Sequence, residues 1–452
     1  MEYGPPSGKE EKKILILSPY YPLPENVGGR MRTMNFARFF KKYGEVDLLY
    51  LRSDSKESNN SNIFRKEYCI NPWRESKKGR NGKRKGVHIL FKERIKMILD
   101  GTPPILTQWH SDSLEEFVNL VEKGKYDLIL CRYIQDTYPL FKLRKELYML
   151  EKVPIKGLGD ETIESATSVI GGKPKLEEQE TKVDLKTKEH TIDEQIINAQ
   201  NLYSKFKKLI INKFIMYYQR RCLDFGAGLF CSKADLDLIT NRETRGSAYI
   251  IPNTYPSGIS NFAGGNSGGY NNKNLFFFVG TLNYEPNASG LKWFITTIFP
   301  HLRELNNHSK LIVVGRWPSE ELKRLCEENP DIELYADAPD VIPFYEKCGI
   351  FIVPVLTGGG TRIKILEAAM ARRLVFSTPF GAYGLDVDDG KELMLFTDKD
   401  SFIKKYNSLD SADKYGDMVN KLRILVENKY SPDGFSKSME VVCNDVFQQV
   451  GV

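Results

Sequence analysis

The stretch IVPVLTGGGTRIKILEAAM, residues 352–370, decides the fold because it joins a strand, a glycine turn and a helix. The apolar run at its start predicts the end of a buried strand. Three glycines follow, Gly358, Gly359 and Gly360. The remaining residues place apolar side chains three and four positions apart, the spacing of an amphipathic helix. Strand, turn and helix in this order direct backbone N–H groups and a helix dipole at an anion.

Two cations, Arg362 and Lys364, stand at the start of this helix, where the dipole disfavours positive charge. That cost indicates an anion bound there, and Glu367 one turn later would reach sugar hydroxyls if the anion is a nucleotide diphosphate. On an ideal helix the two cations point about 160° apart. We therefore predict that the helix starts after Thr361, with Arg362 in the turn. The alternative is an ordinary strand–helix turn with a solvated basic end.

These residues resemble the nucleotide-binding core of the glycosyltransferase group 1 family, retaining enzymes of the GT-B fold, and in particular its GGGTR-type branch. The resemblance rests on GGGTRIKILEAAM and on LVFSTPFGAYGLDV, which follows it, and it runs over nearly all of residues 12–400. Family members carry a pair of Glu residues. The second matches Glu367, whereas the first falls on Gly359, which is a departure from the family pattern.

A second departure concerns an Arg and a Lys that the family has soon after the first strand of the same domain. Here the segment reads GTLNYEPN, and the two positions fall on Thr281 and Asn287. The diphosphate charge must then be met elsewhere, and Arg362 and Lys364 are the replacements, with Arg316 as a further possibility. The expected donor-binding residues are Gly28, Gly29, Gly280, Thr281, Gly358, Gly359, Gly360, Thr361, Arg362, Lys364 and Glu367.

Length and composition indicate a soluble protein of two domains, because 452 residues exceed the usual size of one. No apolar run is long enough for a transmembrane helix, and residues 1–11 lack the apolar core of a signal peptide. Seven cysteines without paired spacing favour a reducing compartment over a disulfide or zinc framework. A net charge of +6 is too small to indicate nucleic acid as a partner.

Strands and helices alternate in both halves of the chain, which predicts an α/β protein with doubly wound parallel sheets. The resemblance implies the GT-B arrangement, in which two Rossmann-like domains face a cleft. We assign residues 1–254 to an N-terminal acceptor domain and residues 274–430 to a C-terminal donor domain. The Gly/Asn/Ser-rich residues 255–273 are predicted to be the linker. The last helix, in residues 431–452, is expected to cross back onto the first domain.

Gly28 and Gly29 end a Pro-rich loop after the first strand. The resemblance implies that this loop faces the donor phosphates and the acceptor, and paired glycines let backbone approach a ligand closely. The alternative is a helix start that requires a positive φ. Arg30 and Arg32 follow, and we expect one of them to face the cleft and the other to be solvated.

Asp160 lies in GLGDE, after a strand predicted near 153–159. It matches the place where the family has a His or Asp beside the reacting sugar, so the resemblance makes Asp160 and Glu367 the candidate catalytic residues. A helix N-cap is the alternative for Asp160. The five histidines do not cluster, and no acidic pair follows a strand in a way that would hold a metal. No metal and no cofactor are therefore expected.

Residues 74–98 combine a basic loop with a short basic amphipathic segment. This pattern suits an anionic membrane surface, and family members use such a patch to reach lipid-linked acceptors. A solvated loop is the alternative. The predicted location is the cytoplasm, with peripheral contact at the inner face of the membrane.

The predicted function is transfer of a sugar, with retention, from a nucleotide-sugar donor to a glycan or lipid-linked acceptor in polysaccharide biosynthesis. A non-catalytic nucleotide- or glycan-binding protein is one alternative. A sugar-nucleotide epimerase or an inverting GT-B enzyme is another. The sequence does not specify the nucleotide, the sugar, the acceptor or the oligomeric state.

Overall fold

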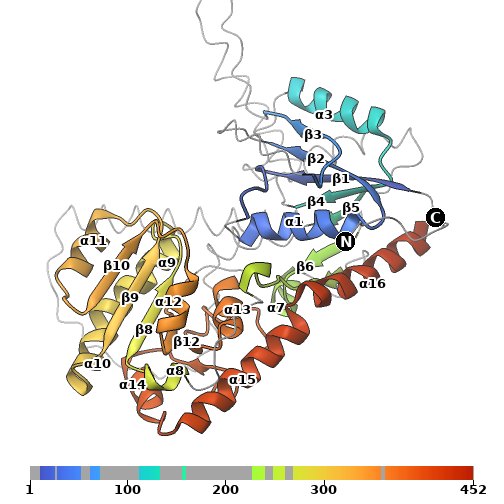
Figure 1. The fold of residues 1–452 in the computed structure, drawn as a ribbon. Helices are drawn as coiled ribbons and strands as arrows, with labels where there is room; N and C mark the ends of the chain where they lie inside the picture. Colours follow the sequence, from blue (N-terminus) through green and yellow to red (C-terminus); the bar gives the residue numbers. More distant parts are fainter. Residues whose placement is uncertain are drawn as a thin grey trace, which may run out of the picture.

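The computed structural model describes residues 11–25, 28–51, 62–71, 111–132, 155–158, 227–239, 248–259, 268–357 and 362–450. Within these ranges the chain forms two parallel β-sheets, each flanked by helices (Figure 1). In both sheets the first strand lies in the interior, and the strand order reverses beside it. This is the doubly wound pattern, so the prediction of an α/β protein with two parallel sheets is confirmed.

The first sheet has the strand order β3-β2-β1-β4-β5-β6-β7. Its strands are β1 (Lys12–Ser18), β2 (Gly44–Tyr50), β3 (Glu67–Cys69), β4 (Leu128–Cys131), β5 (Ile155–Leu158), β6 (Gly228–Phe230) and β7 (Ala248–Ile250). The helices described in this half are α1 (Gly28–Phe40), α3 (Ser111–Gly124) and α7 (Lys233–Ile239).

The second sheet has the order β10-β9-β8-β11-β12-β13. Its strands are β8 (Leu275–Val279), β9 (Lys310–Gly315), β10 (Ile332–Ala336), β11 (Ile350–Val353), β12 (Leu374–Ser377) and β13 (Met394–Leu395). The helices are α8 (Gly268–Asn271), α9 (Glu285–Trp293), α10 (Phe299–Leu305), α11 (Glu320–Glu327), α12 (Ile342–Lys347), α13 (Ile363–Met370), α14 (Lys399–Asn407), α15 (Ala412–Lys429) and α16 (Pro432–Val450).

The central strand β8 shows why its sequence, LFFFV, folds as a strand buried on both faces. Phe276 and Phe278 point into one apolar core, while Phe277 points into the core on the opposite face of the sheet. Side chains alternate between faces along a strand, so three consecutive aromatics supply both cores. Burial on both sides is typical of parallel sheets covered by helices, and it fixes the position of the residues that follow β8.

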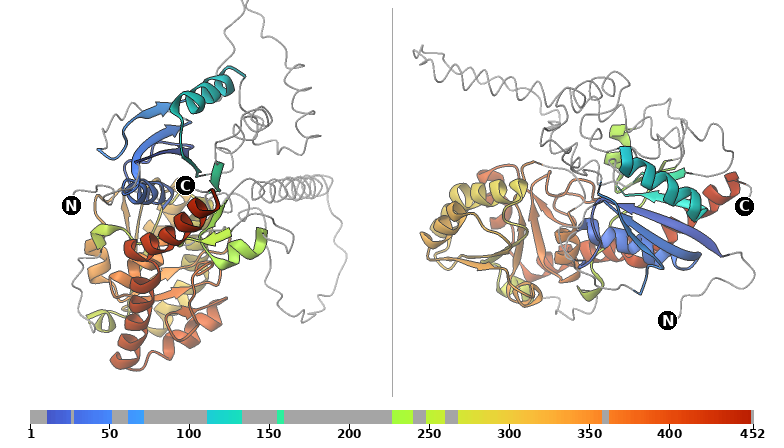
Figure 2. Two further views of the ribbon diagram at one scale, coloured as in Figure 1. Left: turned by 90° about the vertical axis from the view of Figure 1, so that its right-hand side faces the viewer. Right: turned by 90° about the horizontal axis from the view of Figure 1, so that it is seen from above.

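The last helix, α16, leaves the C-terminal half and lies along the N-terminal half (Figures 1 and 2). Phe435, Met439 and Val442 on its inner side are buried in the same apolar core as β1 and α1. The ring of Phe435 packs edge-on against Phe36 of α1, with 5.1 Å between the ring centroids. The helix therefore completes the core of the N-terminal half.

The segment predicted as the linker is described at its two ends. Tyr255 and Ile259 are buried in one core of the second sheet, and residues 268–271 form α8. The backbone N–H of Tyr255 donates to the carbonyl of Tyr430 at 3.2 Å. These ends are therefore packed into the protein instead of forming an extended tether, while the domain boundaries at 254 and 274 stay a prediction.

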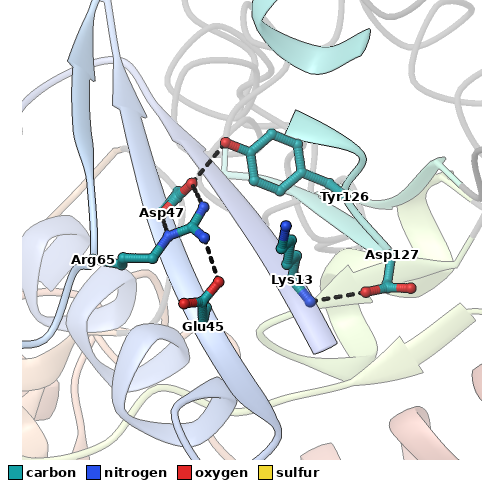
Figure 3. A network of polar contacts seen from close by, with 6 residues as sticks. All are labelled: Lys13, Glu45, Asp47, Arg65, Tyr126 and Asp127. Carbon is teal, nitrogen blue, oxygen red and sulfur yellow. Dashed lines mark hydrogen bonds and ion pairs between the residues drawn. The ribbon is translucent and has the colours of Figure 1, made fainter. Parts of the chain in front are cut away.

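A polar network in the first sheet is centred on a buried carboxylate of β2 (Figure 3). Asp47 on β2 is fully buried and accepts hydrogen bonds from Arg65 Nε at 2.9 Å and Nη2 at 2.5 Å. The Tyr126 hydroxyl donates to it at 2.7 Å, and Glu45 pairs with the same Arg65. Burial and the neighbouring carboxylate raise the pKa of Tyr126. This network is structural, because it ties β3 and the start of β4 to β2.

Replacing Phe435 with Ala tests the packing of α16. We expect Phe435→Ala to lower the free energy of unfolding by about 3–5 kcal/mol, because it removes a buried aromatic and leaves a cavity. Val441→Ala is the control on the same helix, since Val441 is 57% exposed and surface changes cost about 0.5 kcal/mol or less. Urea unfolding at equilibrium measures both. Equal effects would show that α16 does not pack against α1 in solution.

Candidate functional site

The predicted donor site lies where the strand order of the second sheet reverses. Strands β8 and β11 are neighbours there, and their connections to β9 and β12 leave on opposite sides. Gly280 follows β8, and α13 is the next helix after β11. A crevice at this switch point, outside the carboxyl ends of the strands, is where open α/β sheets bind ligands.

Arg362 lies in the turn and not in the helix, as predicted. Helix α13 begins at Ile363, and Arg362 is its N-cap residue, with an extended backbone (φ −81°, ψ 97°). The side chain is 8% exposed, and Nη2 donates to the Thr357 carbonyl at 3.5 Å. Arg362 lies before the first helical residue. The angle of about 160° that an ideal helix would impose between Arg362 and Lys364 therefore does not apply.

Lys364 reaches back from α13 to the carboxyl end of β8. Its Nζ donates to Asn287 Oδ1 at 2.9 Å and lies 4.6 Å from the centroid of the Phe278 ring. Asn287 Nδ2 in turn donates to the Thr281 carbonyl at 3.0 Å. A Cβ added at Gly280 would lie 2.9 Å from the ammonium group, so glycine at this position leaves room for the cation.

The two departures from the family pattern therefore meet at one place. The resemblance puts family cations at Thr281 and Asn287, and this chain has none at either position. The structure brings the ammonium group of Lys364 onto Asn287. The positive charge beside β8 is thus supplied by α13, which supports the interpretation that Lys364 replaces a missing cation. Arg316, the further possibility, is exposed.

Removal from water and the nearby Arg362 lower the pKa of Lys364 to about 7, while Glu367 acts in the opposite direction. Burial raises the pKa of Glu367, and the Tyr345 hydroxyl and Lys364 partly offset this rise. Tyr345 is fully buried on α12 and donates to Glu367 Oε2 at 3.1 Å. Tyr345 therefore fixes the carboxylate one turn below the cations, and the sequence carried no signal for this contact.

Gly28 and Gly29 begin α1, and neither has a positive φ. The alternative that glycine is required there for its backbone conformation is therefore wrong. A Cβ at Gly28 would lie 2.8 Å from Cδ1 of Ile363, the first residue of α13. The N-terminal ends of the two helices thus touch across the two halves, and a larger residue at position 28 would require the Ile363 side chain to shift.

Arg132, which the sequence analysis did not single out, supports the same turn. It follows β4 at the carboxyl edge of the first sheet and is fully buried. Its Nε donates to Thr33 Oγ1 at 3.0 Å and its Nη2 to the Gly29 carbonyl at 3.4 Å. Thr33 Oγ1 also donates to that carbonyl at 3.0 Å. An Arg directly after a buried strand was the signal that could have identified it.

Of the two arginines after the glycines, Arg32 is the buried one. It is 2% exposed, and its Nη1 donates to Asn253 Oδ1 at 2.8 Å. Arg30 is partly exposed and donates to the Leu23 carbonyl at 3.1 Å. The structure thus distinguishes a buried Arg32 from a partly exposed Arg30, whose guanidinium contacts its own loop.

Several predicted site residues lie outside the described residues: Asp160, Gly358, Gly359, Gly360 and Thr361. Their proposed roles stay predictions. Strand β5 ends at Leu158, which pairs with Cys131 of β4. Within the described ranges, no group of three or more His, Cys, Asp or Glu side chains could hold a metal ion.

The chain is similar to glycosyltransferases in sequence. Residues 273–410 match the family described as Glycosyl transferases group 1. A protein of Klebsiella pneumoniae, described as an uncharacterized 44.6 kDa protein in the cps region, is 24% identical over 406 residues, which cover 87% of this chain and 89% of that protein. The matched family segment contains Gly280, Arg362, Lys364 and Glu367.

Solved glycosyltransferases share the fold over nearly the whole chain. A glycosyltransferase of Rickettsia africae has a TM-score of 0.60 at 12% identity, covering 97% of this chain and 99% of that one. The HepE protein of Anabaena, in complex with UDP and glucose, has a TM-score of 0.59 at 11% identity, covering 96% and 100%. A sucrose-phosphate synthase of Thermosynechococcus elongatus has a TM-score of 0.61 at 12% identity, covering 97% and 100%. These matches establish the GT-B fold.

The lowered pKa of Lys364 predicts that anion binding depends on pH. A bound diphosphate favours the charged ammonium, so affinity should be full below the free-state pKa of about 7. Above it, binding must take up a proton, and the affinity should fall by up to about tenfold per pH unit. Calorimetric titration with a nucleotide-sugar measures this, because its diphosphate does not titrate in that range.

Lys364→Arg is the matched control, since arginine stays charged throughout. Its affinity should be nearly independent of pH from about pH 6 to 9. The same pH dependence in both proteins would show that Lys364 is not the titrating group.

Proposed function

We propose that this chain, a glycosyltransferase of the GT-B fold with a group 1 domain, transfers a sugar from a nucleotide-sugar donor to a glycan or lipid-linked acceptor, with retention at the anomeric carbon. One observation carries the proposal. Lys364 lies beside Gly280 at the switch point, Arg362 is close enough to it for the two charges to interact, and Glu367 is fixed one turn below. This arrangement offers positive charge to a diphosphate and a carboxylate to ribose hydroxyls.

The protein's task in this reaction is to position the donor and to stabilise charge on the leaving diphosphate. The bond from the anomeric carbon to the diphosphate oxygen breaks, and the acceptor oxygen takes its place as the acceptor hydroxyl loses its proton. Arg362 and the ammonium form of Lys364 hold the diphosphate, whose negative charge increases in this step. Asp160 is proposed to lie beside the reacting sugar, and no protein nucleophile is assigned.

The comparisons support a nucleotide-sugar as the donor and polysaccharide synthesis as the pathway. HepE binds UDP and glucose, and UDP-glucose in a further structure. The Klebsiella relative is described by its place in a cps region, which supports a role in polysaccharide synthesis. We further propose that the chain belongs to the GGGTR-type branch, that it needs neither metal nor cofactor, and that it acts in the cytoplasm.

A donor panel tests the proposed reaction. Purified protein is incubated with UDP-, GDP- and ADP-sugars and with candidate glycan or lipid-linked acceptors, and release of nucleoside diphosphate is measured with and without acceptor. We expect acceptor-dependent release with one donor and a product that keeps the donor's anomeric configuration. Binding without turnover across the panel would favour a non-catalytic protein, and interconversion of free donors would favour an epimerase.

Arg362→Ala should weaken binding of a nucleoside diphosphate by about 1.5–3 kcal/mol, the range for a hydrogen bond to a charged group. Arg324→Ala is the control, because Arg324 is an exposed cation on α11 with no proposed role in binding. It should leave the affinity unchanged. Calorimetric titration gives both values. A silent Arg362→Ala would place the diphosphate elsewhere.

Glu367→Gln should weaken binding of the nucleoside diphosphate while leaving competition by inorganic diphosphate largely unchanged, because Glu367 is proposed to contact ribose. The amide keeps an oxygen that can accept from Tyr345, so the fold should be preserved. The competition assay separates the two contributions. Loss of inorganic diphosphate binding in this variant would instead assign Glu367 to the phosphates.

The basic residues 74–98 lie outside the described residues, and we propose that they contact an anionic membrane surface. Among the helices that the structure describes, none is long and apolar enough to cross a membrane. Binding to vesicles that contain anionic lipid should weaken steeply as salt rises, because screening weakens the attraction. Replacing Lys83, Arg84 and Lys85 with Gln should remove most of it in a co-sedimentation assay.

A matched control replaces three exposed lysines of the C-terminal half, Lys310, Lys347 and Lys404, with Gln. It removes the same charge from another part of the molecule and should leave vesicle binding intact. Equal losses in both triple variants would indicate an effect of net charge alone, and no binding by the wild type would indicate a solvated loop.

A further inference from the structure

Asn287 is buried beside the end of β8, and both ends of its amide are engaged. It lies in the first turn of α9 and is 8% exposed. Its Nδ2 donates to the Thr281 carbonyl at 3.0 Å, and its Oδ1 accepts from Lys364 Nζ at 2.9 Å. With the amide turned over, an N–H group would face the ammonium and an oxygen would face the carbonyl. The two contacts therefore fix the amide with its oxygen toward Lys364.

The helix that carries Asn287 is held close to the chain on both sides of the switch point. The Asn287 backbone N–H donates to the Tyr284 carbonyl at 2.9 Å, in the turn after β8. A Cβ added at Gly290, one turn further along α9, would lie 2.1 Å from the carbonyl oxygen of Pro354, directly after β11. Such close packing leaves α9 little room to shift, so the amide oxygen has a fixed place.

Lys364 reaches this oxygen from a different helix. Its side chain leaves the first turn of α13 and ends over the Phe278 ring of β8, with 4.6 Å between Nζ and the ring centroid. A lysine stem is flexible, and the contact with Asn287 selects the conformation that places Nζ beside Gly280, which is partly exposed. An ammonium group has three N–H donors, so a single contact with Asn287 does not exhaust them.

Two charged groups act on Lys364, and both belong to the same stretch of chain. Arg362, in the turn before α13, disfavours the ammonium form, whereas Glu367, one turn along the helix, favours it. Glu367 is in turn held by the Tyr345 hydroxyl of α12 at 3.1 Å. Among the contacts that the structure describes, β8 and α9 give Lys364 a ring and an amide, and neither is charged. The Asn287 oxygen is therefore a neutral acceptor for the cation.

We propose that Asn287 is a positioning residue whose amide oxygen aims the Lys364 ammonium group at the donor diphosphate. The proposal rests on the proposed function, in which Lys364 binds that diphosphate, and Asn287 acts only through Lys364. A hydrogen bond to the charged form of a group favours that form. The same contact thus sets both the direction and the charge of the cation.

Two substitutions of Asn287 should act on Lys364 in opposite directions. Asn287→Leu keeps a similar size but lacks the oxygen, so it should lower the pKa of Lys364 below its value of about 7. Asn287→Asp places a negative charge there and should raise that pKa. Because the proposed binding requires the ammonium form, affinity is full below the pKa and falls above it. The pH at which affinity falls should therefore move down in Asn287→Leu and up in Asn287→Asp.

The experiment is calorimetric titration of the full-length variants with the nucleotide-sugar that binds in the donor panel, UDP-glucose first, on both sides of the wild-type pKa. At the acidic end Asn287→Leu should weaken binding by about threefold to tenfold, the usual effect of losing one hydrogen bond. The loss should grow as the pH rises. In a Lys364→Met background Asn287→Leu should have no further effect, because the two residues act as one unit.

Asn329→Leu is the matched control. Asn329 is a partly buried amide of the same half, and its Nδ2 donates to the Leu325 carbonyl at 2.7 Å. This variant should leave the affinity and its pH dependence unchanged. The charge of Lys364 can also be followed without a donor, by NMR of protein that contains isotope-labelled lysine, with Lys364→Arg to assign the signal. The same downward and upward shifts are expected there.

A loss of affinity that is equal at every pH would overturn the proposal, since Asn287 would then support only the fold. A further loss in the Lys364→Met background would overturn it as well. Should Asn287→Leu fail to fold, the upward shift in Asn287→Asp decides the question. A wild-type protein that binds no donor of the panel would contradict the proposed function itself, and NMR would then still show whether Asn287 controls the charge of Lys364.

Discussion

The hydrogen bond from Lys364 Nζ to Asn287 Oδ1 joins the two helices that flank the switch point of the second sheet. It ties the start of α13 to the start of α9, directly above the end of β8. The ring beneath the ammonium group, Phe278, belongs to the buried core, so the charge is held by the part of the domain that is least able to move. An interior that is close-packed transmits such a constraint, so the core fixes the position of the ammonium group.

The position of Lys364 also carries an electrostatic cost, because the ammonium group lies near another cation. Two cations, Arg362 and Lys364, lie close together near the positive end of a helix, and Glu367, the acid that acts on Lys364, is engaged by Tyr345. Burial, and after it the neighbouring Arg362, lowers the pKa of Lys364. Unfavourable local electrostatics that packing maintains are typical of functional sites, and an anion is the chemical species that removes the cost.

Sequence reasoning recovered the features that rest on local periodicity. The apolar runs gave the long strands, and the conflict between helical spacing and two cations placed Arg362 outside α13. Strands β3 and β13 were missed because three and two residues at a sheet edge carry no clear apolar pattern. Tyr345 was missed for another reason. Its role comes from a contact with Glu367, 22 residues away in the chain, and a single sequence gives no signal for that pairing.

The return of α16 to the first sheet has a consequence for how the protein is made. Phe435, Met439 and Val442 are buried in the same core as α1, yet they are synthesised hundreds of residues after it. Until they emerge, the apolar face of α1 has no covering from this helix, although its own strands were synthesised hundreds of residues earlier. Domains usually fold in the order of their synthesis, but here the N-terminal half is completed after the C-terminal half. The synthesis of α16, and not that of its own strands, sets the moment at which this half acquires its full stability.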